Sequence, residues 1–315
     1  MLLTSLTVLL PVLFVVALGY WAGRAKKFDA DQVQGINELV LDYALPAIMF
    51  VSITKTTRSE MLAEVPFLIS LLVAFLGFFL IVFCISFFLL HHSLGEAALQ
   101  ANLVSLPSVA FMGIPIFRGL FGEQGVLSIT TASVLALVTV APLTVVLLEV
   151  HGQRSGNHAP RVSALVVGAL ESSFKKPMVW APLFAAVLVL FDVRVPGEID
   201  AMLTLIGSAT SGASLFVAGL IISAYEIKLN FEVIANVVGK MVAQPAFMVL
   251  LIALFGVQEP FAREAILICA IPTAVLAPLL APRYRTYESE AASTLVLTML
   301  AMVVTFPLAI VLTGG

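Results

Sequence analysis

Two proline-containing dipeptides in this sequence have the residue types that could bind a ligand. Pro107 is followed by Ser108, Pro272 is followed by Thr273, and each pair interrupts an apolar stretch. Proline lacks a backbone N–H and clashes with the preceding turn, so each stretch is predicted to be a broken helix. The half-helix after each break would begin with free N–H groups that carry partial positive charge. Together with the two hydroxyl groups, these amides would suit an anion such as a carboxylate.

Two polar residues lie on the half-helix before the first break, Asn102 and Ser105, and we include them in the predicted substrate site. An alternative is a pair of ordinary proline kinks whose backbone groups are satisfied by Ser and Thr side chains. Two breaks at corresponding places in the two halves of a chain favour a transporter binding site instead.

Lys240 lies about nine residues inside a further apolar stretch, and Gln244 follows one helical turn later, just before Pro245. A charge at membrane depth is costly and is by default a functional hypothesis. Lys240 could attract an anionic substrate or stand in for a coupling cation. The alternative is a lysine whose long side chain extends to the inner surface. We include Lys240 and Gln244 in the predicted site.

Asp42 is the candidate for a coupling ion, H⁺ or Na⁺. It lies about eight residues inside the second apolar stretch. The alternative is a carboxylate paired with a basic residue at the inner rim.

Other chemistry finds no support in the sequence. Cys84 and Cys269 both fall in apolar segments, which argues against a disulfide and against a metal site. No HExxH motif, Ser/His/Asp arrangement or pair of catalytic carboxylates is present. We therefore expect neither an enzyme nor an organic cofactor. Net charge is −3 and no basic run exceeds two residues, so nucleic acid is not an expected partner.

The composition indicates which elements position these residues. The 315 residues are 61% hydrophobic and 11% charged, whereas soluble domains carry about 25% charged residues. The chain is therefore predicted to be an all-α polytopic membrane protein in a lipid bilayer. Since about 20 apolar residues cross a membrane, we expect ten spans. They cover residues 3–23, 34–53, 65–90, 97–118, 124–149, 176–192, 201–224, 232–256, 264–282 and 289–313.

Loop charges set the expected orientation. With the N-terminus outside, ten of the sixteen Lys and Arg residues fall in inner loops and five in outer ones, and Lys240 lies within a span. The excess of positive charge on the inner side predicts that both termini are outside. A short interfacial helix is expected within residues 160–176.

The two halves of the sequence carry traces of repetition. Pro107 and Pro272 are 165 residues apart, and the same offset separates Pro142 from Pro307. Five spans in each half would place the second half upside down. We therefore predict a first repeat at 1–150, a cytoplasmic linker at 151–175 and an inverted second repeat at 176–315, with helices 4 and 9 broken and crossing.

Several segments resemble the auxin efflux carrier family. The run Ser105-Leu-Pro-Ser-Val-Ala-Phe-Met-Gly-Ile-Pro115, followed by Leu120-Phe-Gly122, resembles that family's fourth helix. The run Gln34-Gly-Ile-Asn-Glu-Leu-Val, continuing to Leu45-Pro46, resembles its second helix. Lys240 to Pro245, and then Ala270-Ile-Pro272 to Ala281 and Tyr284, resemble its eighth and ninth. The resemblance covers nearly the whole chain.

The resemblance implies the fold of bile-acid symporters and sodium/proton antiporters. In that fold helices 1, 2, 6 and 7 form a scaffold, helices 3–5 and 8–10 form a moving transport domain, and a homodimer through the scaffold is possible. Plant members have a long hydrophilic loop between the halves, whereas here the linker has about 25 residues. This compact form is similar to a bacterial inner-membrane branch that is often assigned to malonate. One departure is Ser108, where plant carriers of the PIN type have Asn.

The sequence thus predicts a secondary transporter of small organic anions, malonate or a similar carboxylate, that works by alternating access at the helix crossover. Symport with H⁺ or Na⁺ and uniport both stay open. The alternatives are an exporter of auxin-like monocarboxylates and a membrane sensor that detects a ligand in the same pocket.

Overall fold

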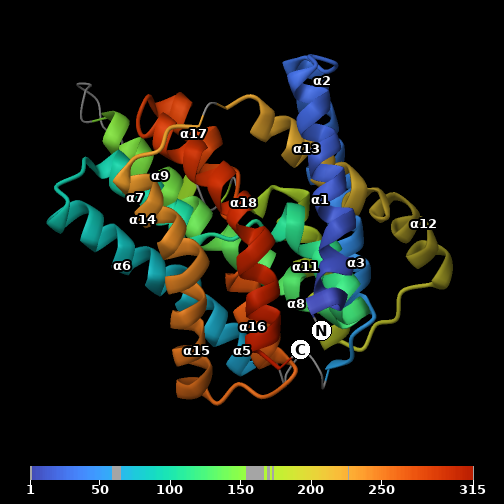
Figure 1. The fold of residues 1–315 in the computed structure, drawn as a ribbon. Helices are drawn as coiled ribbons and strands as arrows, with labels where there is room; N and C mark the ends of the chain where they lie inside the picture. The colour runs from blue at the N-terminus through green and yellow to red at the C-terminus, as the bar shows by residue number, and fades with distance from the viewer. Residues whose placement is uncertain are drawn as a thin grey trace. The chain divides into compact units, whose positions relative to one another are not determined.

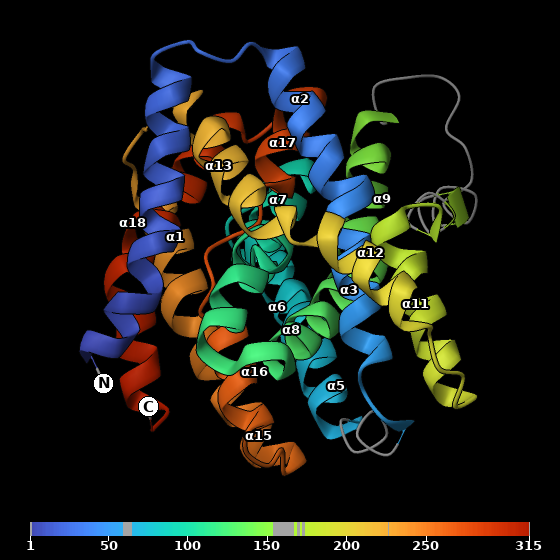
Figure 2. The same cartoon turned by 90° about the vertical axis from the view of Figure 1, so that its right-hand side faces the viewer.

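A computed structural model describes residues 2–58, 65–153, 167–168, 171, 174–225 and 227–314. Within that part the chain is almost entirely helical (Figures 1 and 2). Contacts divide it into two compact units. Unit 1 comprises Met1–Leu68, Val109–Val134 and Lys175–Tyr225, and unit 2 comprises Ile69–Ser108, Leu135–Phe174 and Glu226–Gly315.

The first half of the chain combines α-helices with short π-helical turns, which are marked η. In chain order its helices are α1 (Leu2–Arg24), α2 (Ala30–Glu38), η1 (Leu39–Ala44), α3 (Leu45–Thr54), α5 (Val65–Leu72), η2 (Val73–Gly77), α6 (Phe78–Cys84), η3 (Ile85–Leu89), α7 (Leu94–Ser105), η4 (Val109–Gly113), α8 (Ile114–Val138) and α9 (Val140–Gln153). Most of the π-helical turns continue directly into an α-helix.

The second half continues in the same way. Its helices are α11 (Pro177–Leu190), α12 (Gly197–Gly207), α13 (Ala209–Ser223), α14 (Phe231–Val238), η5 (Gly239–Ala243), α15 (Gln244–Phe255), α16 (Phe261–Cys269), α17 (Leu276–Tyr284) and α18 (Glu288–Leu312). Most of the linker predicted at 151–175, with its interfacial helix, lies outside the described residues.

Six helical segments in the described part of the chain are long and apolar enough to cross a membrane. They are Asp31–Thr54, Val65–Leu89, Val109–Gly152, Gly197–Ser223, Phe231–Phe255 and Glu288–Leu312. The chain is therefore a multi-pass membrane protein. The count of ten spans and the inverted repeat stay predictions, because several of the predicted spans are short or interrupted helices.

In unit 1, α1 and α13 pack side by side in both views (Figures 1 and 2). Glycines allow this close approach. A Cβ added to Gly19 would lie 2.1 Å from the carbonyl oxygen of Phe216, and one added to Gly219 would lie 2.1 Å from that of Val16. Small residues at such positions let membrane helices approach each other closely and gain packing contacts.

Three of the π-helical turns end two residues before a proline. η1 precedes Leu45-Pro46, η4 precedes Ile114-Pro115 and η5 precedes Gln244-Pro245. A proline inside a helix removes one donor and clashes with the carbonyl of residue i−4, and a locally wider turn relieves that clash. Before Pro245 this wider turn is η5.

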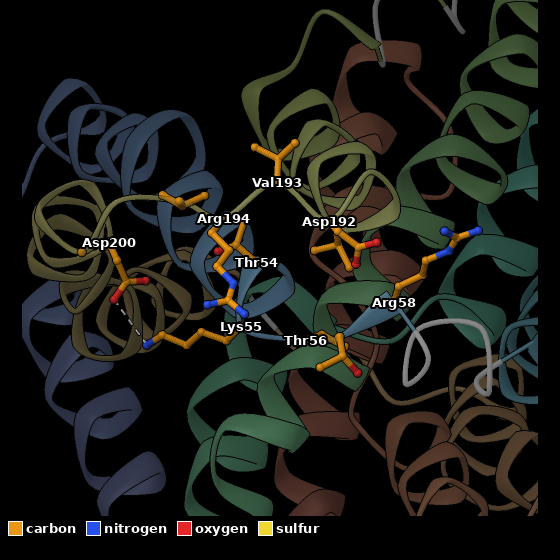
Figure 3. Close-up of a pocket in the computed structure, with 12 residues that line it drawn as sticks. Thr54, Lys55, Thr56, Arg58, Asp192, Val193, Arg194 and Asp200 are labelled. Carbon is orange, nitrogen blue, oxygen red and sulfur yellow. Dashed lines mark ion pairs between the residues drawn. The ribbon is translucent and has the colours of Figure 1, made fainter.

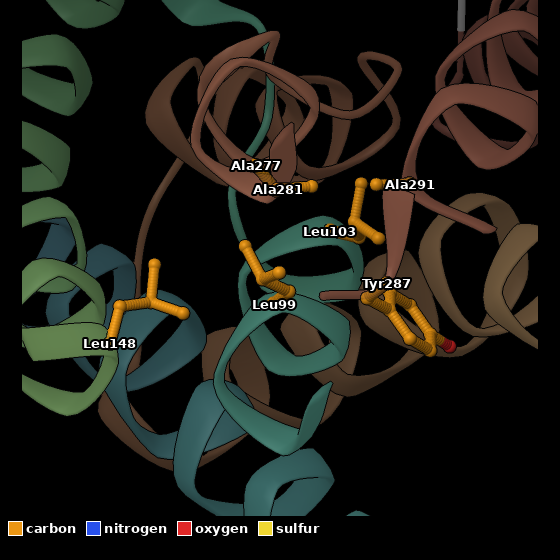
Figure 4. Close-up of a cluster of buried hydrophobic side chains, with 7 residues drawn as sticks. All are labelled: Leu99, Leu103, Leu148, Ala277, Ala281, Tyr287 and Ala291. Atoms are coloured by element: carbon orange, nitrogen blue, oxygen red, sulfur yellow. The ribbon is translucent and has the colours of Figure 1, made fainter. Parts of the chain in front are cut away.

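The core of unit 2 includes a cluster that packs α7 against α9, α17 and α18. Leu99 and Leu103 of α7 lie among small residues of the facing helices, as Figure 4 shows. The buried members are Leu99, Leu103, Leu148, Ala277, Ala281, Tyr287 and Ala291. Because alanine leaves room for leucine, α7 is held closely against α17, which positions the two broken helices.

The two units differ from the scaffold and transport domains that the resemblance implies at residues 65–68 and, over a longer stretch, at residues 109–134. Residues 109–134 belong to unit 1, although the resemblance assigns them to the transport domain. Specific contacts explain the difference. Ser214 of α13 donates to the carbonyl oxygen of Phe111 at 2.9 Å, and Leu127 packs in a buried cluster with Ile53 and Val189. Each unit combines segments from both predicted repeats.

Candidate functional site at the helix crossover

Both predicted helix breaks are present, and they meet within unit 2. α7 ends at Ser105 and α16 ends at Cys269, and an extended segment follows each. The two segments pair as an antiparallel bridge between Pro107 and Thr273. The N–H of Ser108 donates to the carbonyl oxygen of Pro272 at 2.8 Å, and the N–H of Ala274 donates to that of Leu106 at 2.9 Å. Each break therefore satisfies backbone groups of the other, as a membrane interior requires.

The two hydroxyl groups beside the prolines are buried and unpaired. Ser108 is 2% exposed and Thr273 is 0% exposed. Among the described residues, neither Ser108 Oγ nor Thr273 Oγ1 has a hydrogen-bond partner. These two side chains therefore do not satisfy the backbone at the breaks, whereas Thr298 Oγ1 accepts from the N–H of Thr273 at 3.4 Å. Burying a hydroxyl without a partner costs about 1–3 kcal/mol, so two together at one bridge call for an explanation.

Asn102 and Ser105 lie on the last turn of α7. They differ in whether a polar side-chain atom is left for a substrate. Asn102 is fully buried and donates from Nδ2 to Thr144 Oγ1 at 2.9 Å. Within the described chain its Oδ1 has no partner. The hydroxyl of Ser105 donates to the carbonyl oxygen of Ala101 at 2.7 Å, inside its own helix. Ser105 therefore contributes to the crossover through its backbone carbonyl.

Lys240 and Gln244 hold the ends of both interrupted helices. Lys240 Nζ donates to Gln244 Oε1 and, at 3.0 Å, to the carbonyl oxygen of Cys269 at the end of α16. Gln244 Nε2 donates to the carbonyl oxygen of Ser105 at the end of α7, at 2.6 Å. Lys240 is 0% exposed, so the alternative that it extends to the inner surface is wrong.

This placement has an electrostatic consequence. The last carbonyls of a helix carry partial negative charge, and a cation near them is stabilising. Lys240 contacts one such carbonyl directly and reaches the other through Gln244. An ammonium group has three donors, and two of them are used within the described part of the chain.

The first turn of α17 supplies partial positive charge from the opposite direction. α17 begins at Leu276, directly after the bridge, with Val275 at its N-cap. The first amides of a helix have no acceptor within it, and their N–H groups project outward from its N-terminal end, here toward the break. Pro278 stands at the third helical position and lacks an N–H, so the amides of Val275, Leu276 and Ala277 make up this end.

Lys240 and Gln244 belong to a longer polar stripe with a spacing of four residues along α14, η5 and α15. Its members are Glu232, Asn236, Lys240 and Gln244. Gln100 Nε2 of α7 donates to Asn236 Oδ1 at 2.8 Å, and both side chains are buried. The stripe was missed at the sequence level except for its last two members. The signal was available, because polar residues every four positions share one helical face.

The stripe ends in a polar cluster around Glu232. Tyr287 donates to Glu232 Oε1 at 2.6 Å, and Asn236 Nδ2 donates to the Tyr287 hydroxyl at 3.1 Å. His92 Nε2 lies 3.2 Å from the same Glu232 oxygen, and its Nδ1 lies 2.9 Å from Ser86 Oγ. Burial and the neighbouring Glu232 carboxylate raise the pKa of Tyr287, so its hydroxyl stays protonated and keeps donating.

The remaining predicted site residue is Asp42. It lies on η1, in unit 1, with an exposed side chain, whereas the crossover belongs entirely to unit 2. The inner-rim ion pair considered for Asp42 is not seen among the described residues. A role as a coupling-ion carrier stays a prediction.

The crossover combines three features that suit a small anion and one that suits a hydrogen-bond donor or a cation. Within the described residues, the first three are two unpaired hydroxyl groups, a buried lysine and a helix N-terminus, and the fourth is an unpaired amide oxygen. Hydroxyl groups and the amides of a helix N-terminus bind carboxylates, and unpaired oxygens also accept from substrate hydroxyls or bind a cation. No group of three or more metal-ligating side chains is found in the described part of the chain.

The chain is similar to known transport proteins along most of its length. A family described as membrane transport proteins matches residues 4–310. An Escherichia coli K12 protein named "Uncharacterized transporter YfdV" is 32% identical over 95% of this chain and 95% of its own length. A Rhizobium meliloti protein named "Putative malonate transporter" is 22% identical over 94% of this chain and 92% of its own. A mouse protein named "Lysosomal cholesterol signaling protein" is 25% identical over 69% of this chain and 26% of its own.

Proposed function

Because this chain belongs to the auxin efflux carrier family of membrane transport proteins, we propose that it is a secondary transporter of small organic anions that binds its substrate at the crossover of unit 2. Malonate or a similar carboxylate is the proposed substrate. The observation that carries the proposal is the pair of buried hydroxyls, Ser108 and Thr273, that have no partner within the described residues.

A carboxylate fits what these groups lack. Each carboxylate oxygen accepts up to two hydrogen bonds, and both hydroxyls can donate. Hydrogen bonds to a charged group are worth about 1.5–3 kcal/mol each, which is comparable to the cost of keeping the hydroxyls unpaired without substrate. Lys240 adds positive charge to the same region. No carboxylate neutralises this charge among the described residues, because the partners of Lys240 are neutral oxygens.

Malonate is preferred over a larger monocarboxylate for two reasons. The two hydroxyl donors buried at the crossover, Ser108 Oγ and Thr273 Oγ1, favour a ligand rich in carboxylate oxygens over an aromatic one. The malonate-named relative also aligns over nearly the full length of this chain. Import or export would proceed by alternating access, in which the two units expose the site to each side in turn.

Uptake into proteoliposomes tests the proposal. The purified protein is reconstituted and supplied with radiolabelled malonate under an imposed proton gradient, an imposed sodium gradient or a membrane potential alone. We expect accumulation under one of the three conditions, in a bacterial inner-membrane lipid mixture. Asp42→Asn is measured in the same assay. If protons are coupled through Asp42, uptake by this variant no longer depends on the proton gradient, whereas sodium coupling or uniport is unaffected.

Two other outcomes distinguish the alternatives. Competition by indole-3-acetate that exceeds competition by unlabelled malonate would favour an auxin-like monocarboxylate carrier. Saturable malonate binding without transport under any gradient would favour a sensor, an alternative to which the signalling name of the mouse relative lends some weight. Absence of both binding and uptake would contradict the malonate assignment.

A further inference from the structure

Unit 1 contains a cavity of about 690 Å³ that takes no part in the crossover. It is lined by the end of α3 and residues 55–58 after it, the last turn of α11, the segment between α11 and α12, and the first turn of α12 (Figure 3). Three basic side chains, Lys55, Arg58 and Arg194, line it together with two carboxylates, Asp192 and Asp200. From these residues we propose that the cavity binds the phosphodiester headgroup of an anionic phospholipid.

The charges in the cavity are incompletely paired. Lys55 Nζ lies 3.7 Å from Asp200 Oδ2, which accounts for one cation and one carboxylate. Arg58 and Arg194 form no ion pair or hydrogen bond in the described part of the chain. Three cations against two carboxylates leave a surplus of one positive charge, which a phosphodiester, with its single negative charge, neutralises.

Arginine determines the class of anion. The planar guanidinium group donates two parallel N–H bonds that match phosphate oxygens, so unpaired arginines favour phosphate over simple halide binding. The nearby threonines add little, because Thr54 and Thr56 already donate to backbone carbonyls of α3. Recognition in this cavity therefore rests on the arginines and on Lys55.

The position of the cavity favours a lipid over a soluble phosphate. Thr54 is the last residue of one membrane-crossing segment, Gly197 is the first residue of another, and both line the cavity. The cavity thus lies at the membrane boundary, at the level of lipid headgroups. Beside it, Phe191 is 77% exposed and Met202 and Leu205 of α12 are 70% and 78% exposed, an apolar surface suited to acyl chains.

Lipid binding by the full chain in nanodiscs tests the proposal. Thermal unfolding and native mass spectrometry are compared in phosphatidylglycerol and in phosphatidylcholine, first for the wild-type protein. We expect a higher unfolding midpoint in phosphatidylglycerol and retained phosphatidylglycerol adducts. In Arg58→Gln/Arg194→Gln we expect retention to weaken at least tenfold, since one charge-assisted hydrogen bond is worth about that factor.

A matched control and a soluble anion complete the test. Arg24→Gln/Lys27→Gln removes the same charge from exposed positions at the end of α1 and should leave phosphatidylglycerol retention unchanged. Equal behaviour of wild type in the two lipids, or equal weakening in both double variants, would overturn the proposal. Displacement of the lipid by millimolar inorganic phosphate would assign the cavity to a soluble anion instead. If Arg58→Gln/Arg194→Gln fails to fold, the two single variants and the comparison of wild type in the two lipids still test the proposal.

Discussion

The side-chain amide of Gln244 donates to the carbonyl oxygen of Ser105 over 2.6 Å, 139 residues away in the sequence. Through this bond the eighth predicted helix holds the end of the fourth, while Lys240, one turn earlier, holds the carbonyl of Cys269 at the end of α16. One face of the helix formed by η5 and α15 therefore contacts the ends of both interrupted helices at the crossover. Both side chains are fully buried.

Lys240→Met tests what the charge of Lys240 contributes at the crossover. Methionine has a similar length and no charge, but it leaves two buried acceptors, Gln244 Oε1 and the carbonyl oxygen of Cys269, without this donor. We therefore expect the unfolding midpoint to fall by a few degrees with the protein still folded, while malonate transport falls at least tenfold because the positive charge near the site is lost. Lys228→Met, at an exposed position, is the control and should transport normally. Normal transport by Lys240→Met would remove Lys240 from the substrate site.

Gln244→Ala leaves the carbonyl oxygen of Ser105 without its side-chain donor. Hydrogen bonds between membrane helices average about 0.6 kcal/mol and reach about 1.7 kcal/mol, and a tightly buried carbonyl lies toward the upper end. The unfolding midpoint measured in detergent should fall by a few degrees. A midpoint equal to that of wild type would mean that water or another donor replaces the amide.

Ser108→Ala and Thr273→Val should separate stability from function. Removing a buried hydroxyl that has no partner relieves a cost of about 1–3 kcal/mol, so thermal stability should be unchanged or raised. Ser133→Ala is the control, because its buried hydroxyl donates to the carbonyl of Ile129 within its helix. Thermal unfolding without substrate measures all three. A loss of stability confined to the two crossover variants would mean that their hydroxyls are bonded after all.

Two glycines of α13 give a matched pair for the packing of unit 1. Gly219→Ala should be destabilising, because its Cβ would meet the backbone of Val16 at 2.1 Å. Gly212→Ala, in the same helix, has open space and should gain up to about 1 kcal/mol from helix propensity. Thermal unfolding of the two variants checks the order. If Gly212→Ala were the less stable of the two, the close α1–α13 contact would be disproved.

Tyr284 should make the protein sensitive to strong alkali. Burial and the hydrogen bond to Glu149 raise its pKa to about 12. Unfolded tyrosine has a pKa near 10, so the folded state holds this proton more tightly. The resulting stabilisation is complete below about pH 10 and is lost as the pH rises from 10 to 12. The unfolding midpoint of wild type should fall more steeply over that range than that of Tyr284→Phe, and parallel curves would contradict the shifted pKa.

Local chemistry explains which features could be predicted from the sequence. The breaks at Pro107 and Pro272 were predictable because proline disfavours the helix interior and each is followed by a hydroxyl residue in an apolar stretch. Proline alone is not sufficient, since Pro182 and Pro307 lie inside the helices α11 and α18. Their direct pairing was predicted only as a crossing; the bridge of Pro107 with Thr273 depends on tertiary structure. Ser105 was predicted as a side-chain ligand, but its hydroxyl donates within its own helix, a common choice for serine that sequence alone does not reveal.

Other features required the fold. Glu232 and Asn236 were overlooked because each, taken singly, is an ordinary polar residue, and only the four-residue spacing links them to Lys240. The arginine-lined cavity of unit 1 was not foreseen, because Arg58 and Arg194 are 136 residues apart and meet only through the packing of α3 against α11 and α12.

Malonate binding by Ser108→Ala/Thr273→Val is the most direct test of the crossover as the substrate site. The dissociation constant is measured with radiolabelled malonate on purified protein, beside wild type and Ser133→Ala, after thermal unfolding has shown that all three are folded. Loss of two hydrogen bonds to a charged ligand should raise the dissociation constant at least tenfold, with Ser133→Ala unchanged. A folded double variant that binds malonate as tightly as wild type would contradict the assignment of the substrate site to the crossover.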